Sequence, residues 1–213
     1  MPQITDIRPQ KKHHTGEPRF NIYLDGKFGF AVPAVALAKA GLAVGNQLSQ
    51  QEIDELVKEN EYLKVYDRVL NFISFRPRSE KEIKDWFKRK EVGEETQKMI
   101  WEKLTHLGYI NDEEFVKWWI DQRTTFRPVG KRVIEMELRQ KGISPNLVSQ
   151  YLSISVSSSS ELELAKKAAE KKIKLYKNLP PQEFKQKMSS FLARRGFSWE
   201  TIEQVIDENC QKE

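Results

Sequence analysis

The chain repeats itself at an interval of about fifty residues, and this repetition restricts its fold more than any other feature. The tripeptide Phe75-Arg76-Pro77 returns as Phe126-Arg127-Pro128, an offset of 51 residues. Apolar positions follow the same offset, and a further offset of 54 residues adds a third copy. The matched apolar positions are Ile83, Phe87 and Val92, then Ile134, Leu138 and Ile143, then Met188, Leu192 and Phe197. Such a period predicts one helical unit used three times, in which no unit buries its apolar face alone.

Each copy is expected to contain three helices. In the first copy, Ser79-Glu80-Lys81-Glu82 matches a capping box that opens the second helix. In the second copy, Asn111 followed by three acidic residues caps the first helix, and Ser144-Pro145 starts the third. Gly142 and Gly196 stand where the second helices of copies two and three must end, because glycine accepts a left-handed cap.

The first fifty residues have a different pattern. Residues 19–24 alternate between apolar and polar side chains, and Asp25-Gly26 then leads into residues 27–30. Asp-Gly between alternating segments predicts a β-hairpin, because both turn positions favour positive φ. Residues 4–7 could add a third strand, a short helix is expected over 34–40, and another helix begins over 49–59.

The predicted fold class is therefore mainly α, with three tandem three-helix repeats and a small N-terminal region that contains a β-hairpin. Four consecutive serines, Ser157 to Ser160, indicate a linker before the third repeat. The predicted boundaries are 1–61 for the N-terminal region, 62–110 for repeat 1, 111–154 for repeat 2, 155–160 for the linker and 161–213 for repeat 3.

Composition and motifs argue against several classes of protein. The chain of 213 residues has no apolar run of 18 residues and no N-terminal signal pattern. Its one cysteine, Cys210, has no internal partner for a disulfide. A cytoplasmic location is therefore expected. A metal site from His13, His14 and His106 is improbable without clustered cysteines. Gly41 to Gly45 lacks the lysine of a phosphate-binding loop. We therefore expect no enzyme activity, no metal and no cofactor.

The positive charge is concentrated in the repeats. Residues 62–152 carry 18 basic and 14 acidic side chains, a balance of +4, whereas residues 1–61 carry 7 and 8. The second helix of each repeat and the segment before it are basic in all three copies, which is typical of a surface that binds a polyanion or an acidic protein. A solvated face balanced by nearby glutamates is the alternative from charge alone. The adjacent Trp118 and Trp119 point about 100° apart on a helix. One is expected in the repeat core and the other at a contact between repeats, although stacking on bases is an alternative.

A family resemblance rests on these same segments. Leu107 to Phe115, with the sequence LGYINDEEF, resembles the Gly-Tyr-Leu-Asp-Asp-x-x-Phe-Ala signature of the bacterial RecX regulatory proteins. Arg123, Gly130, the run from Ile134 to Leu138 and Lys141-Gly142-Ile143 are similar to later parts of that family's pattern. Residues 76–82 resemble its Arg-x-x-Ser-x-x-Glu-Leu start. The chain departs from the signature with Asn111 for the first aspartate and Val116 for alanine. The resemblance covers residues 62–152 most clearly.

The resemblance implies a regulator of the RecA recombinase that lies in the groove of the RecA–single-stranded DNA filament. Such a protein would inhibit RecA ATP hydrolysis, strand exchange and filament growth, and so modulate DNA repair and recombination. Implied partners are the RecA filament and single-stranded DNA, with double-stranded DNA left open; no membrane is implied, and a monomer is expected. From charge and position, the expected RecA or DNA contacts are Arg76, Lys81, Arg123, Arg127, Lys131, Arg132, Arg139 and Lys141.

Two alternatives remain at this point. One is a stand-alone nucleic-acid-binding protein that uses the basic second helices as its contact. The other is a helical scaffold for a different protein, in which the N-terminal hairpin region is the docking surface.

Overall fold

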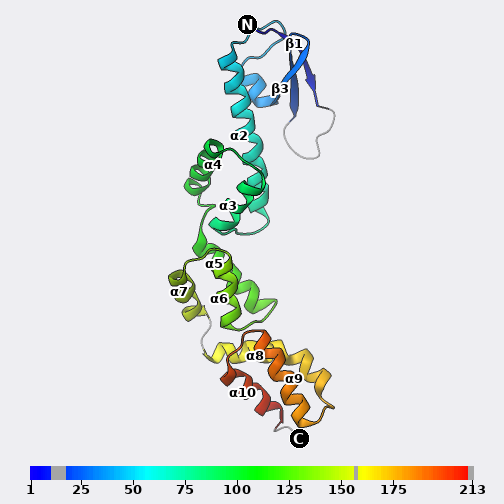
Figure 1. The fold of residues 1–213 in the computed structure, drawn as a ribbon, viewed down its shortest axis with the longest axis vertical. Helices are drawn as coiled ribbons and strands as arrows, with labels where there is room; N and C mark the ends of the chain where they lie inside the picture. The colour runs from blue at the N-terminus through cyan, green and yellow to red at the C-terminus, as the bar shows by residue number, and fades with distance from the viewer. Residues whose placement is uncertain (11–17, 156–157, 211–213) are drawn as a thin grey trace. The chain divides into compact units, whose positions relative to one another are not determined.

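The computed structural model describes residues 1–10, 18–155 and 158–210, which hold three strands and ten helices (Figure 1). His13 and His14 lie outside the described residues. The described chain divides into two compact units. One contains residues 1–75 and 91–103, and the other contains residues 76–90 and 104–213.

The first unit begins with an antiparallel sheet of strand order β1-β2-β3. These strands are Ile4–Pro9, Arg19–Leu24 and Lys27–Pro33. The hairpin turn between β2 and β3 is as predicted, because Asp25 and Gly26 have φ of 48° and 79°. The third strand that the sequence left open is present, since β1 pairs with β2 from Ile4 to Pro9.

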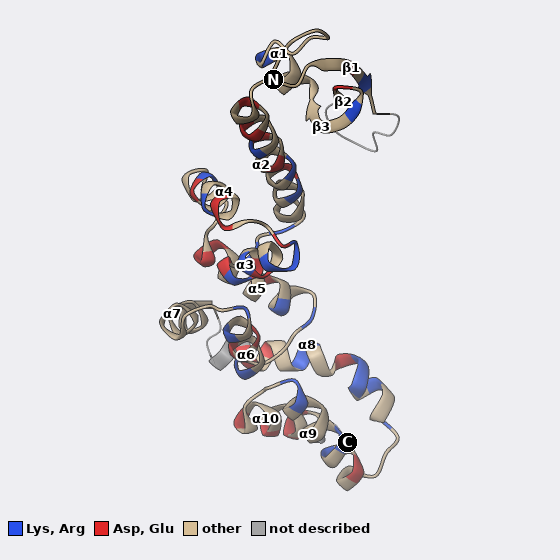
Figure 2. Cartoon of the chain, turned by 45° about the horizontal axis from the view of Figure 1, so that its top comes forward, with Lys and Arg blue, Asp and Glu red and all other residues tan. Residues whose placement is uncertain are grey.

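Helices α1 (Ala34–Lys39) and α2 (Gln50–Ser74) follow the sheet. Ile22, Val32, Ala36 and Leu56 belong to one buried cluster, so the sheet, α1 and the start of α2 share a core. Sequence analysis expected one helix over 49–59 and a separate first helix of repeat 1. The structure has a single helix there, because no glycine or proline interrupts residues 50–74. Acidic and basic side chains are interspersed along it (Figure 2).

Helices α3 (Glu80–Arg89) and α4 (Glu94–His106) complete the segment of repeat 1. Ser79 caps α3 as predicted, because its hydroxyl accepts the amide N–H of Glu82. The second half of the predicted capping box is wrong. The Glu82 carboxylate binds two cationic side chains instead of the Ser79 amide.

Repeat 2 consists of α5 (Asp112–Thr125), α6 (Lys131–Gln140) and α7 (Pro145–Ser155). Its caps agree with the sequence: the Asn111 side chain accepts the amides of Glu113 and Glu114, and Gly142 has a φ of 84°. The buried cluster draws on all three helices. Its members are Phe115, Val116, Ile120, Val129, Ile134, Leu138, Ile143, Val148 and Leu152.

Repeat 3 consists of α8 (Ser158–Tyr176), α9 (Pro181–Arg194) and α10 (Trp199–Cys210). Its separate core contains Phe184 together with Met188, Leu192 and Phe197, the three positions that the repeat alignment marked as apolar. Gly196 has a φ of 80°, which confirms the left-handed helix end. Within the expected linker over 155–160, Ser155 is the last residue of α7 and residues 158–160 belong to α8.

The predicted fold class is thus confirmed: mainly helical, with three tandem three-helix repeats after a small antiparallel sheet. Within the described segments, no helix has the length and apolar character needed to cross a membrane. The same segments contain no group of three or more potential metal ligands.

Candidate functional site

The second helix of repeat 1, α3, is joined to the second helix of repeat 2, α6, end to end. The Ser79 hydroxyl donates a hydrogen bond of 2.8 Å to the backbone carbonyl of Lys141, which caps the C-terminus of α6. The same oxygen accepts the Glu82 amide at 3.2 Å, and Ser79 is fully buried. One side chain thus satisfies polar groups at the start of one helix and the end of another. We call this contact the first joint.

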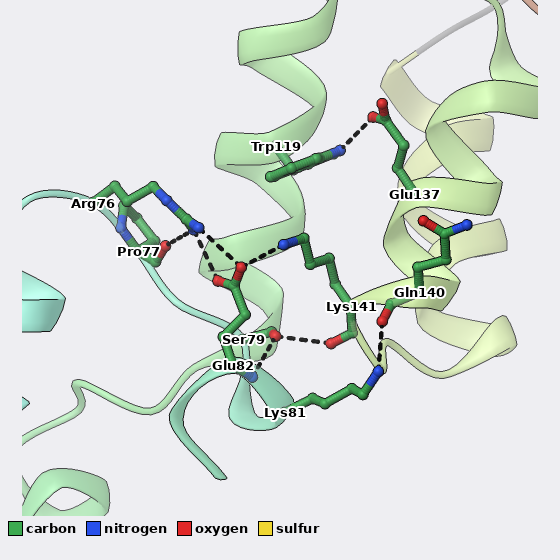
Figure 3. Close-up of polar contacts among 9 residues, drawn as sticks. All are labelled: Arg76, Pro77, Ser79, Lys81, Glu82, Trp119, Glu137, Gln140 and Lys141. Carbon is green, nitrogen blue, oxygen red and sulfur yellow. Dashed lines mark hydrogen bonds and ion pairs between the residues drawn. The ribbon is translucent and has the colours of Figure 1, made fainter. Parts of the chain in front are cut away.

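A three-residue ion cluster surrounds the first joint (Figure 3). Arg76 binds both carboxylate oxygens of Glu82 at 2.9 Å, and the Lys141 ammonium binds one of them at 2.6 Å. Burial alone would raise the pKa of the Glu82 carboxyl, but the hydrogen bonds from Arg76 and Lys141 outweigh it and lower the pKa to about 2. Both cations are therefore held by an acid that stays ionised at neutral pH.

Two further contacts fix the first joint. Lys81 reaches the carbonyl of Gln140 at 2.9 Å, so it adds a second side chain at the end of α6 (Figure 3). The Asp112 carboxylate accepts the amide of Glu80 at 2.8 Å, and burial is the main cause that raises its pKa. The start of α3 is therefore held from both α5 and α6.

Arg123 is also held inside repeat 2. Its Nε donates to Glu137 at 2.6 Å, and the indole N–H of Trp119 donates to the same oxygen at 2.9 Å. The Arg123 guanidinium lies 4.6 Å from the centre of the Trp119 ring. Trp118 and Trp119 both pack against the repeat 2 core, and Arg76 lies over Trp118 at 5.3 Å. Trp118 thus meets a residue of repeat 1, as expected for a tryptophan at a contact between repeats, whereas the Trp119 indole N–H is bound within repeat 2.

A second joint connects α6 to the end of α9. The Gly130 amide, at the start of α6, donates to the carbonyl of Arg195 at 2.8 Å, and the Arg195 guanidinium donates to the Pro128 carbonyl at 2.9 Å. A side chain at Gly130 would overlap the backbone of Gly196. The repeat offsets place Gly130 on Ser79 and Arg195 on Lys141. Aligned positions at helix ends therefore meet twice along the chain, through the Ser79 hydroxyl in the first joint and the Gly130 amide in the second.

The eight basic residues singled out from the sequence fall into two groups. Arg76, Lys81, Arg123 and Lys141 make the intramolecular contacts described above. The other four lie on α6 or just before it. They are Arg127, Lys131, Arg132 and Arg139.

This second group is more available to a partner. Arg127, Arg132 and Arg139 are exposed, and only Arg139 forms an ion pair within the described segments, with Glu135 one helical turn earlier. A groove of about 720 Å³ runs along α6 and the end of α9, and Arg132, Arg139 and Arg194 are among its lining residues. Arg194 and Arg195 belong to the basic second helix of the third copy, but the eight expected contacts did not include them. The sequence held a signal for them, because they directly precede Gly196, which aligns with Gly142 at the end of α6.

Family models match the chain in four consecutive segments. They are the RecX regulatory protein N-terminal domain at residues 2–49 and the first, second and third RecX three-helix domains at 66–104, 111–152 and 159–206. The regulatory protein RecX of Bacillus subtilis is 36% identical over 208 residues, which covers 98% of this chain and 77% of that protein. The chain belongs to the RecX family.

Other comparisons give the same result. The RecX of Listeria welshimeri is 34% identical and spans 93% of this chain and 72% of that protein. A crystal structure of a regulatory protein RecX superposes with a TM-score of 0.64 at 30% identity, and it covers 97% of this chain and all of the other. The RecX structure from Lactobacillus salivarius gives a TM-score of 0.61 at 25% identity over 72% of this chain. The RecX resemblance inferred from the signature segments is confirmed.

Proposed function

We propose that this RecX chain is a non-enzymatic regulator that binds the groove of the RecA–single-stranded DNA filament and inhibits RecA ATP hydrolysis, strand exchange and filament growth. The observation that carries the proposal is the match of all four RecX domains, in order, across the chain. Through this action the protein would modulate DNA repair and recombination.

The arrangement of repeats 2 and 3 supports this role. The joint between α6 and α9 places basic side chains of both repeats along one groove. Contacts spread over several modules give affinity through many weak interactions instead of one deep site. Such contacts to acidic RecA segments or DNA phosphates should weaken as salt concentration rises.

Of the eight residues proposed as contacts, those outside the ion clusters fit the role best. Arg127, Lys131 and Arg132 form no ion pair in the described part of the chain, so a partner would not need to break one. Arg76, Lys81, Arg123 and Lys141 would instead act by fixing the positions of the helices that carry the contacts.

The test is ATP hydrolysis by the cognate RecA on single-stranded DNA, titrated with this protein. We expect inhibition by the wild type and a large loss of inhibition for the double variant Arg127→Glu/Lys131→Glu. A matched double variant, Arg68→Glu/Lys64→Glu on α2, controls for the change in net charge and should inhibit like the wild type. No inhibition by the wild-type protein would overturn the proposal.

A stand-alone nucleic-acid binder remains the second candidate, because the groove arginines would serve it equally well. It predicts tight, salt-sensitive DNA binding together with no effect on RecA.

A further inference from the structure

The two joints bring aligned positions together and differ in their electrostatics: the Ser79 hydroxyl meets the Lys141 carbonyl in the first, and the Gly130 amide meets the Arg195 carbonyl in the second. In the first joint, Glu82 neutralises Arg76 and Lys141. The repeat offsets of 51 and 54 residues place Arg127 on Arg76, Arg195 on Lys141 and Val133 on Glu82. The second joint thus keeps both cations of the cluster but has valine where the first joint has the carboxylate.

The aligned carbonyls of Pro77 and Pro128 each accept a hydrogen bond from a guanidinium group of their joint, at 2.8 and 2.9 Å. The donors are not equivalent, because Arg76 donates in the first joint and Arg195, which aligns with Lys141, donates in the second. Val133 lies inside the second joint, because a side chain at Gly196 would meet it at 2.6 Å. Burial lowers the pKa of Arg195, and repulsion from Arg127 lowers it further, so the two cations are close enough to interact.

Among the residues that the structure describes, no acid forms an ion pair with Arg127 or Arg195 in place of the missing carboxylate. Glu161 is buried beside this joint, but its carboxylate accepts the backbone amide of Lys131 at 3.4 Å. Within the described segments it forms no ion pair with Arg127 or Arg195. Glu135 is held by Arg139 at 2.5 Å. An anion from outside the chain is therefore the natural partner of the two guanidinium groups.

The neighbouring residues indicate which anion fits. Phe126, directly before Arg127, leaves 74% of its surface exposed, and an exposed aromatic ring beside arginines offers a platform for a base. Arg132, Arg139 and Arg194 continue the positive charge along the adjacent groove. A single carboxylate would use two of these cations, whereas a chain of phosphates can use all of them.

We propose that the second joint is a phosphodiester site for single-stranded nucleic acid, in which Arg127 and Arg195 hold a backbone phosphate and Phe126 stacks on a neighbouring base. The first joint, by contrast, is closed by its own glutamate. The location of the bound strand inside the RecA filament rests on the proposed function, whereas the site itself does not.

The test uses the full chain without RecA and a fluorescein-labelled oligo-dT of about 20 nucleotides, followed by fluorescence anisotropy. The decisive pair is Val133→Glu and Val133→Gln, which have similar size and differ in charge. Glutamate at this position rebuilds the acid of the first joint. We expect Val133→Glu to weaken binding about tenfold relative to Val133→Gln. Equal affinity of the two variants would overturn the proposal.

Surface variants keep the test decisive if the Val133 variants do not fold. Arg127→Gln should weaken binding about tenfold and reduce the salt slope of the binding constant by about 0.7. Phe126→Ala should also weaken binding about tenfold. Arg68→Gln, an exposed arginine on α2, is the matched control and should bind like the wild type. An Arg127→Gln variant that binds like Arg68→Gln would exclude the site.

Two further readouts separate this inference from its alternatives. If Arg127→Gln loses affinity for poly-glutamate but keeps affinity for oligo-dT, the site binds protein carboxylates and the phosphodiester assignment is wrong. If wild-type oligo-dT binding depends on Arg127 while RecA ATP hydrolysis is unaffected, the site stands and the proposed function fails. If RecA ATP hydrolysis is inhibited but oligo-dT binding does not depend on Arg127, the site is overturned and the proposed function stands.

Discussion

The buried hydroxyl of Ser79 donates to the carbonyl of Lys141, 62 residues later, and so connects the start of α3 to the end of α6. Each helix end exposes backbone groups that have no partner within the helix. This hydrogen bond satisfies one such carbonyl without water, and it does so at the point where two repeats meet. These two repeats are therefore joined through their helix ends.

Ser79→Ala should destabilise repeats 1 and 2 more than an ordinary cap deletion does. The variant loses the cap of α3 and also leaves a buried carbonyl unpaired, for a cost of about 2–3 kcal/mol in unfolding free energy. Ser49→Ala is the matched control, because Ser49 caps α2 through a capping box at an exposed position. Ser49→Ala should lower the unfolding free energy by about 1 kcal/mol. Urea unfolding followed by tryptophan fluorescence measures both, and equal losses would show that the Lys141 contact contributes nothing.

At acidic pH, the unfolding free energy should depend on whether the Glu82 carboxyl is ionised. Its pKa is about 2 in the folded protein against an ordinary value of 4.5. An acid with a lowered folded-state pKa stabilises the fold fully above its unfolded pKa, and that contribution disappears as the pH falls from about 4.5 towards 2. The lost contribution is about 3 kcal/mol.

Glu82→Gln tests this pH dependence. At neutral pH it should be about 3 kcal/mol less stable than the wild type, and the difference should shrink as the pH falls through that window. Glu135→Gln, which removes one partner of an exposed pair, should cost less than about 0.5 kcal/mol at any pH. Urea titrations at several pH values give the comparison. A Glu82→Gln deficit that stays constant down to pH 2 would contradict the ion cluster.

Gly130→Ala should disrupt the second joint. The new methyl group would overlap the backbone of Gly196, so α6 and the end of α9 must separate. Gly93 occupies a similar place before α4, where its carbonyl accepts the amide of Gln97, but a methyl group there meets nothing within 4 Å. Gly93→Ala is thus the control for losing glycine at a helix start.

We expect Gly130→Ala to cost at least about 2 kcal/mol more than Gly93→Ala in unfolding free energy, because backbone atoms cannot move aside as flexible side chains can. Limited proteolysis should also cleave the Gly130→Ala variant faster between repeats 2 and 3. Similar stability of the two variants would show that the close approach of Gly130 and Gly196 is not needed.

Local features of the fold could be predicted from the sequence because their causes are local. Asp25-Gly26 needs only its own backbone preferences to make the hairpin turn, and Asn111 needs only the next three amides to cap α5. The repeat offset added long-range information, because it showed which apolar positions are equivalent. The continuous helix α2 was missed because a change in composition near residue 61 suggested a boundary that the backbone does not require.

The ion clusters could not be predicted in the same way. Glu82 stands where a capping box would use it, but Arg76 and Lys141 bind it more strongly once the tertiary fold brings Lys141 near. The sequence also showed eight basic residues as one class. The positions of Glu82, Glu137 and the Gln140 carbonyl separate the four that are held within the chain from the other four.

The central claim, that this protein lies along the RecA filament, is tested most directly by sedimentation. Filaments are assembled from cognate RecA, single-stranded DNA and a non-hydrolysable ATP analogue, mixed with this protein and pelleted. We predict co-sedimentation that saturates below one chain per RecA protomer, because an array of three repeats lying along the filament would span neighbouring protomers. Arg127→Glu should pellet less than the matched Arg68→Glu variant. If the wild-type protein stays in the supernatant at concentrations that saturate free single-stranded DNA, the filament account is contradicted.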